Sequence, residues 1–146
     1  MSRVERSALV RCSARQMFAL VNEVEGYPPR FTWCADAQVL ERSGSAMLAR
    51  LDLRLGALRA SFSTRNTWIE NQRIELALVD GPFSALHGSW QFDALAENAC
   101  RVSLRLEFDF ASRLVGGALA SGFRGLADRM VDEFVDTARR EALVDG

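Results

Sequence analysis

The chain has 146 residues, of which 49% are hydrophobic and 25% charged, and its formal net charge is −1. This length and composition fit one globular domain over residues 1–146 with a single hydrophobic core. The near-zero net charge gives no overall electrostatic case for DNA binding, and no apolar run approaches the ~20 residues of a membrane-spanning helix.

The three cysteines, Cys12, Cys34 and Cys100, are odd in number and widely spaced. Their spacing matches neither a disulfide framework nor a zinc site. We therefore expect reduced thiols and a cytoplasmic location. The first six residues carry charges and no apolar segment, so we expect no signal peptide.

An N-terminal strand and two short helices are predicted at the start of the chain. Apolar and polar residues alternate loosely over residues 4–12, which favours a strand. Ser13 and Gln16 have the spacing of a capping box, in which each side chain hydrogen-bonds the backbone of the other residue and starts a helix. Residues 25–29 are expected to end this helix, and a second short helical or irregular piece is expected over residues 29–33.

A long region of alternating residues follows, from about residue 35 to residue 110. A period of two is typical of strands with one buried face. Turn residues interrupt the alternation near residues 43–45, 56, 70–72, 80–82 and 97–98. Because these connections are short, we predict six consecutive antiparallel strands in addition to the N-terminal one.

From Ser112 onward the apolar spacing becomes three and four, which predicts one long amphipathic helix. A helix of about 28 residues is roughly 40 Å long and can cross a whole sheet. Its apolar stripe consists of Leu119, Phe123, Leu126, Ala127, Met130, Phe134 and Ala138. Since a sheet with one apolar face must cover it, we predict an α+β fold in which a seven-stranded, curved antiparallel sheet wraps around this C-terminal helix.

Two segments carry specific patterns. Residues 27–34 read Tyr-Pro-Pro-Arg-Phe-Thr-Trp-Cys, and residues 81–92 read Gly-Pro-Phe-Ser-Ala-Leu-His-Gly-Ser-Trp-Gln-Phe. They resemble two signatures of the coenzyme-Q-binding START-domain family, Tyr-Pro-x-Phe-Leu-Pro-Trp-Cys and Gly-Pro-Phe-x-x-Leu-x-Gly-x-Trp-x-Phe. Residues 106–112 and 130–139 resemble the last strand and the helix end of that family. The resemblance therefore covers nearly the whole chain and implies the helix-grip, or START-like, fold.

The resemblance implies three alternative functions. Proteins of this group are described as ubiquinone-binding proteins that support respiration, as polyketide-cyclase or lipid-transport proteins, and as bacterial ribosome association toxins that act on the large ribosomal subunit and block subunit joining. We expect first a non-enzymatic binder of ubiquinone, an isoprenoid or another lipid, second such a toxin, and third a cyclase or dehydrase. No cofactor besides such a ligand is expected, and a lipid ligand would allow transient contact with a membrane.

A strongly curved sheet and a straight helix leave a gap, which we expect to hold the ligand. Aromatic walls suit a quinone ring or an isoprenoid tail, and one inward polar group can hydrogen-bond a carbonyl. Arg30 and Thr32 replace an aromatic residue and a proline of the first signature, so one end of the gap is expected to be more polar. The predicted lining consists of Phe31, Trp33, Phe62, Asn66, Phe83, Leu86, Trp90, Phe108, Phe110, Leu119, Phe123 and Met130.

No catalytic or metal-binding residue is predicted. His87, the single histidine, falls on the outward face by strand alternation, whereas a catalytic triad or metal site would need it inside. Cys34 is expected to be a small buried residue rather than a nucleophile, because no base is expected beside it. The carboxylates are expected at strand ends or on outward faces, with no pair at acid–base spacing.

The outward strand positions carry several arginines, and two interpretations stay open. They form a basic stripe that contacts ribosomal RNA, or they belong to a solvated, ion-paired face. The interleaved carboxylates Asp52, Glu107 and Asp109 favour the second interpretation. The arginines concerned are Arg50, Arg54, Arg59, Arg65, Arg101 and Arg105.

Overall fold

The computed structural model describes residues 1–111 and 117–145, with side chains through residue 142. The N-terminal part contains β1 (Ser2–Val10), α1 (Ala14–Asn22), a 3₁₀ turn η1 (Val24–Gly26) and α2 (Tyr27–Arg30). The strands that follow are β2 (Cys34–Ser43), β3 (Ala46–Leu55), β4 (Leu58–Ile69), β5 (Arg73–Asp80), β6 (Phe83–Ala96) and β7 (Ala99–Phe110). The last element is α3 (Gly117–Asp145).

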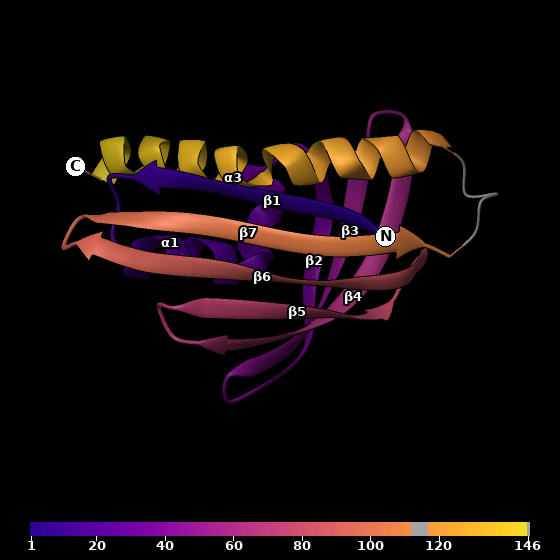
Figure 1. Cartoon of the computed structure of the whole chain (residues 1–146), viewed down its shortest axis with the longest axis horizontal. Coiled ribbons are helices and arrows are strands. Elements are labelled where there is room, and N and C mark those ends of the chain that lie inside the picture. Colours follow the sequence, from indigo (N-terminus) through magenta and orange to yellow (C-terminus); the bar gives the residue numbers. More distant parts are fainter. Residues whose placement is uncertain (112–116, 146) are drawn as a thin grey trace.

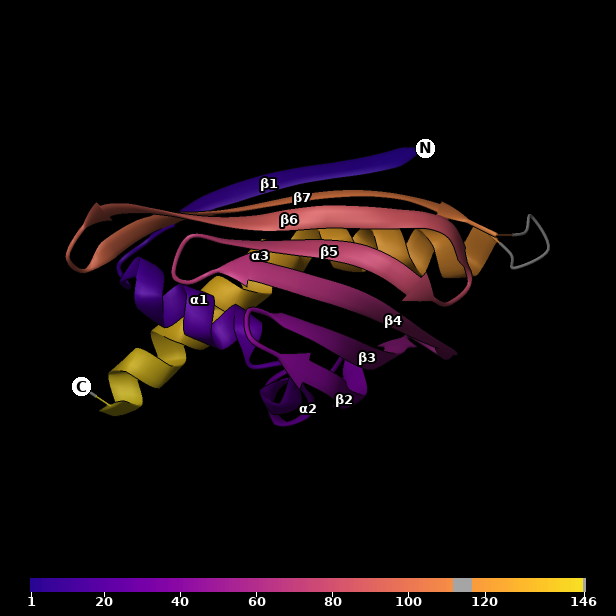
Figure 2. The same ribbon diagram turned by 90° about the horizontal axis from the view of Figure 1, so that it is seen from below.

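The seven strands form one antiparallel sheet in the order β1-β7-β6-β5-β4-β3-β2. Neighbouring strands follow each other along the chain, except that β1 pairs with the last strand, with Val4 opposite Leu106. The sheet curves strongly, and α3 runs along its concave side while α1 and α2 close one end (Figures 1 and 2). The predicted α+β helix-grip fold is therefore confirmed.

Helix α3 fills most of the space inside the curved sheet. The predicted apolar stripe faces the sheet, and Leu126 and Phe134 are almost fully buried. Val131 and Val135, which the stripe did not include, are buried as well. At the edge of the sheet, Arg6 of β1 donates a hydrogen bond to Asp128 of α3 over 2.8 Å. The predicted start of this helix at Ser112 lies outside the described residues.

The short N-terminal helices show both a success and an error of prediction. The capping box is present, with 2.8 Å from Ser13 N to Gln16 Oε1 and 3.0 Å from Gln16 N to Ser13 Oγ. The second helix, α2, begins before the predicted residues 29–33. Its two prolines stand in the first turn, where a backbone N–H has no helical partner and proline is tolerated.

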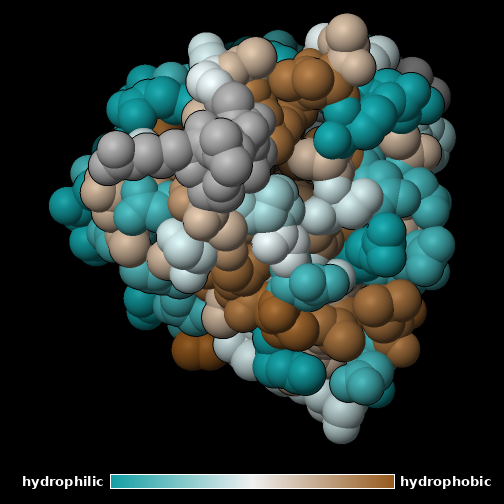
Figure 3. All heavy atoms as spheres, turned by 90° about the vertical axis from the view of Figure 1, so that its right-hand side faces the viewer, coloured by the Kyte–Doolittle hydropathy of each residue, from teal (hydrophilic) through white to brown (hydrophobic). Residues whose placement is uncertain are grey.

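Part of the apolar surface stays outside the core. The end of the molecule at the right of Figure 1 exposes apolar side chains in two areas with polar ones between them (Figure 3). Exposed apolar areas of this kind mark interaction surfaces more often than chance. None of the described helices is long and apolar enough to cross a membrane.

Candidate functional site

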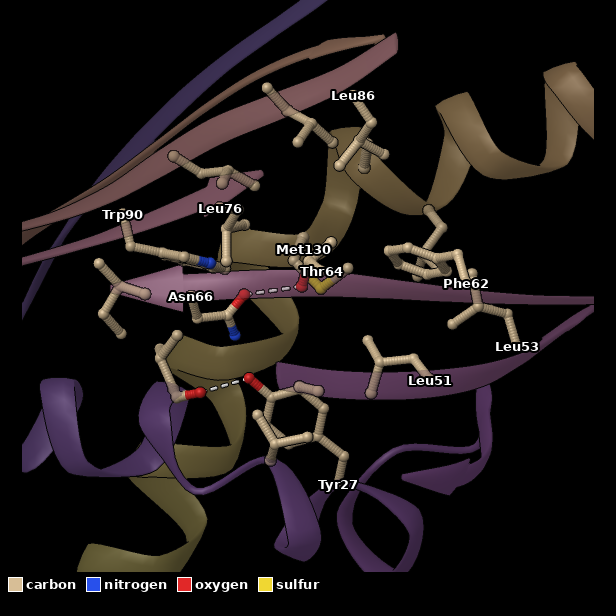
Figure 4. A pocket seen from close by; sticks show the side chains of 18 of the residues that line it. Tyr27, Leu51, Leu53, Phe62, Thr64, Asn66, Leu76, Leu86, Trp90 and Met130 are labelled. Atoms are coloured by element: carbon tan, nitrogen blue, oxygen red, sulfur yellow. Dashed lines mark hydrogen bonds between the residues drawn. The ribbon is translucent and has the colours of Figure 1, made fainter. Parts of the chain in front are cut away.

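A mostly apolar pocket lies between the concave face of the sheet and α3 (Figure 4). Strands β3 to β7 form its floor, α3 covers it, and residues of α1, η1 and α2 close one end. Its cavity volume is about 100 Å³. Seven of the twelve predicted lining residues are in its wall: Trp33, Phe62, Asn66, Leu86, Trp90, Phe123 and Met130.

The other five predicted residues lie beside the pocket rather than in its wall. Phe83 and Phe108 pack against Phe123, each with ring centroids 4.9 Å away, and Phe110 joins the same aromatic cluster. Leu119 is buried one turn before Phe123 on α3. These side chains fill one end of the predicted gap, so the open space is shorter than expected.

Phe31 belongs to a second aromatic cluster at the opposite end. Its ring stacks on Trp33 at 5.0 Å and lies 4.6 Å from Phe134. Tyr27 packs edge-on against both Phe31 and Phe134, and its hydroxyl donates a hydrogen bond to the carbonyl of Val21. Burial raises the pKa of Tyr27 well above its ordinary value, so this hydroxyl stays protonated.

Tyr27 is among the pocket residues that the predicted lining did not include, whereas Phe134 belongs to the apolar helical stripe that was predicted to cover the gap. A signal for each was present, since Tyr27 opens the first signature and Phe134 belongs to the helical stripe. The contribution of α1 through Val21 and Asn22 carried no signal of this kind. It depends on how the short helices dock on α3, which local sequence patterns do not report.

Two polar side chains stand within the apolar wall, and one of them, Asn66, belongs to the predicted lining. Thr64 and Asn66 are both buried, and Thr64 Oγ1 donates a hydrogen bond to Asn66 Oδ1 over 2.6 Å. This bond occupies the carbonyl oxygen of Asn66. Figure 4 shows its amide nitrogen directed toward the side of the pocket where Tyr27 lies. Asn66 therefore presents hydrogen-bond donors to the cavity.

Two further polar atoms of pocket residues have no hydrogen-bond partner among the described residues. They are the indole nitrogen Nε1 of Trp33 and the amide oxygen Oδ1 of Asn22, both fully buried as atoms. An unsatisfied buried polar group costs about 1–3 kcal/mol. Because neither atom has accessible surface, the pocket wall contains one donor and one acceptor that a ligand reaches only when the side chains around them move.

The size of the cavity limits what it holds. A volume of about 100 Å³ corresponds to roughly three water molecules at ~30 Å³ each. Pockets for drug-sized ligands measure about 300–1,000 Å³. A ubiquinone ring with its isoprenoid tail therefore requires the walls to move apart.

Arg30 of α2 connects this helix to α3 and to the end of α1 through hydrogen bonds. Its Nε donates to Glu141 of α3 over 2.7 Å, and its Nη1 donates to Glu23, just after α1, over 3.1 Å. The Arg30 side chain is 23% exposed, and both carboxylates are more exposed than it is. The polar residue that departs from the first signature thus links α2 to α3 and to the end of α1, and it does not line the cavity.

The groups considered for chemistry lie away from the pocket or are inert. His87 is on the convex face, 59% exposed, with Nε2 3.0 Å from a carboxylate oxygen of Glu107. Cys34 is buried, and burial, followed by the charges of Asp36 and Asp52, raises the pKa of its thiol to about 11. A thiol with this pKa is a poor nucleophile at neutral pH. No three His, Cys, Asp or Glu side chains gather as a metal site within the described residues.

The convex face is ion-paired only in part. Of the six arginines predicted there, Arg50, Arg65 and Arg105 have a carboxylate within 4.0 Å, whereas Arg54, Arg59 and Arg101 have none among the described residues. Arg50 lies 3.3 Å from Asp52, Arg65 lies 3.9 Å from Glu41, and Arg105 lies 3.4 Å from Glu107. Arg54 and Arg59 differ from these three. They stand directly opposite each other on β3 and β4, and no carboxylate of the described residues lies within 4.0 Å of either.

A curved seven-stranded sheet around a long C-terminal helix, with a small apolar pocket between them, defines the START-like class of proteins. The aromatase/cyclase Zhui from Streptomyces sp. R1128 has this fold, with a TM-score of 0.85 and 15% identity over 97% of this chain and 95% of its own. Residues 10–135 match the family described as polyketide cyclase / dehydrase and lipid transport. The chain belongs to this family.

Relatives within reach of sequence comparison carry more specific names. The chain is 45% identical to the ribosome association toxin RatA of Pseudomonas aeruginosa over 137 residues, which cover 94% of this chain and 95% of that protein. It is 22% identical to the mitochondrial coenzyme Q-binding protein COQ10 of Dictyostelium discoideum over 134 residues, which cover 89% of this chain and 65% of that protein. The predicted family resemblance is therefore confirmed.

Proposed function

We propose that this chain is a ribosome association toxin, which binds the large ribosomal subunit and blocks its joining with the small subunit. The likeness to RatA over nearly the whole of both chains carries this proposal. The small cavity supports it, because a volume of about 100 Å³ does not accommodate an isoprenoid lipid without opening. We propose a non-enzymatic protein that acts through its surface.

Arg54 and Arg59 are the residues we propose to contact ribosomal RNA. Like charges directly opposite each other on adjacent strands destabilise a sheet, and both side chains are exposed at the end of the β3–β4 hairpin. The guanidinium of Arg54 also donates to the carbonyl of Thr32 over 3.3 Å, which holds it at the strand end. Two phosphate groups would neutralise this pair and release counterions.

The proposed function is tested by inducing the chain in a bacterial host and separating ribosomes on a sucrose gradient. We expect the 70S and polysome peaks to fall, the free 30S and 50S peaks to rise, and growth to stop. A matched culture that expresses the Phe134→Ala variant provides the control for protein load. An unchanged 70S peak at full expression of the folded chain would refute the proposal.

A double variant tests the proposed contact. We expect Arg54→Ala with Arg59→Ala to weaken binding to purified 50S subunits and to reduce the salt slope of log K by about two, one for each lost phosphate contact. The free energy of unfolding should stay equal or rise by about 0.2–1 kcal/mol, because the like-charge pair is gone. Filter binding over a salt series and urea unfolding measure the two quantities.

The control removes two arginines from the same strands. Arg50 and Arg65 are paired with Asp52 and Glu41, so Arg50→Ala with Arg65→Ala is expected to change the salt slope much less. Equal losses of binding in both double variants would show that the opposed pair has no special part in the contact.

The unsatisfied polar atoms favour a second function, binding of a small apolar molecule with a carbonyl group. The indole N–H of Trp33 is the donor for that carbonyl, and the aromatic walls cover the ring. We expect delipidated protein to bind ubiquinone with a single isoprene unit, and Trp33→Phe to weaken it about fivefold, the equivalent of one neutral hydrogen bond. Tryptophan fluorescence measures the titration, and absence of saturable binding excludes this function.

A further inference from the structure

A second hollow lies at the end of the molecule where β1, the β6–β7 hairpin and the last turns of α3 come together, at the left of Figure 1. It measures about 720 Å³ and shares no residue with the pocket under α3. Leu9 and Val10 of β1, Leu95 of β6 and Ala142 of α3 contribute apolar surface. This end hollow is therefore a separate feature.

The end hollow has two large apolar side chains in contact with solvent. Leu9 is 59% exposed and Leu95 is 56% exposed. Leu9 stands opposite Arg101 on the outward side of the sheet edge, and Leu95 lies near the tip of the β6–β7 hairpin. Since neither packs in the core, their exposed surface is available to apolar side chains of a partner.

The charges around the end hollow are positive. Arg11 and Arg139 line it, and no carboxylate does so among the described residues. Arg139 lies 3.8 Å from Asp136 in an exposed pair. A pair of this kind contributes little to stability, so the guanidinium is free to exchange Asp136 for a carboxylate of a partner.

We propose that the end hollow binds an acidic, amphipathic segment of a partner protein. Its apolar side chains cover Leu9 and Leu95, and its carboxylates pair with Arg11 and Arg139. The exposed leucines favour a polypeptide over RNA, whose phosphates gain nothing from them. The concave shape favours inserted side chains over a flat membrane surface. This inference does not depend on ribosome binding.

The test selects random twelve-residue peptides displayed on phage against the full chain. We expect enriched peptides to combine Leu, Ile or Phe with Asp or Glu. Their binding, measured by fluorescence anisotropy, should weaken at least about tenfold in Leu95→Asp and in Arg139→Glu. Ile69→Asp, at 57% exposure, and Arg129→Glu, on the same helix as Arg139, are the matched controls and should leave binding unchanged.

Three results would overturn the proposal: no enrichment above background, enriched peptides without acidic residues, or equal loss of binding in the variants and their controls. A labelled twelve-nucleotide RNA provides a further comparison. If the chain binds it, and if Arg139→Glu weakens this binding but Leu95→Asp does not, the end hollow is an RNA site instead. Sucrose-gradient profiles of the same variants separate this result from the proposed ribosomal function.

Discussion

Replacement of Phe134 by alanine is expected to lower the free energy of unfolding by about 3–5 kcal/mol. Phe134 has no exposed surface, and its ring lies within 4.6–5.3 Å of the rings of Phe31, Tyr27 and Trp90. These neighbours come from two separate parts of the fold, α2 with its C-cap residue and strand β6, so they cannot collapse together into the space left behind. Because the total free energy of unfolding of a small domain is about 5–15 kcal/mol, this variant should be only marginally stable. Urea unfolding measures the loss.

Phe110→Ala is the matched control, because it removes the same side chain at a site that is only partly buried. Phe110 packs on Phe83 at 4.8 Å, but part of its surface is exposed to solvent. We expect less than half the loss seen for Phe134. Equal losses in the two variants would contradict the assignment of Phe134 as the centre of packing between α3, α2 and the sheet.

The second large effect is expected at Gly88 in β6. A Cβ atom there would lie 2.4 Å from the carbonyl oxygen of Arg105 and 2.8 Å from Leu106 Cδ1. The first of these is backbone of the paired strand β7 and cannot rotate away. Gly88→Ala is therefore expected to cost about 3 kcal/mol through overpacking. Thermal unfolding followed by circular dichroism measures it.

Gly125→Ala tests whether this cost comes from the close approach of the strands. A Cβ at Gly125 meets only the end of the flexible Arg129 side chain, at 3.6 Å. Since alanine favours a helix over glycine by up to about 1 kcal/mol, this substitution should raise stability. A loss at Gly125 as large as that at Gly88 would show that the close approach of β7 is not the cause.

Strand alternation, together with the helical stripe of the last segment, was sufficient to predict the arrangement of the sheet around the helix. It put Phe62, Trp90, Phe108 and Phe110 on the concave side, where all four are found. It did not distinguish the residues that line the pocket from those that pack beside it, because Phe108 and Phe110 have the same alternation as Trp90. Whether a side chain borders open space depends on what packs opposite it, here Phe123 of α3.

The charge pattern of the convex face was predictable only in part. Arg50 and Asp52 are two residues apart on one strand, so alternation alone places them side by side. The pair of Arg65 with Glu41 joins β4 to β2, which are not neighbours in the sheet. It depends on the register of three strands, because Glu41 and Arg65 both stand opposite Leu48 of β3. The opposition of Arg54 and Arg59 follows from a two-residue turn with Gly56 at positive φ, which sets the register.

The pocket, the convex face and the end hollow thus suggest three different roles within one protein. The pocket is small, the convex face carries the opposed pair Arg54 and Arg59, and the end hollow combines exposed leucines with positive charge. Under the proposed function, the convex face contacts the ribosome, and we expect the activity not to require a filled pocket.

The most direct test of this account is light scattering on mixing purified 30S and 50S subunits with the delipidated chain. We expect the chain, in excess over 50S, to suppress formation of 70S particles. The Arg54→Ala and Arg59→Ala double variant should suppress it less, and added ubiquinone with a single isoprene unit should change nothing. Normal subunit joining in the presence of excess folded chain, or suppression that appears only when ubiquinone is added, would contradict the account.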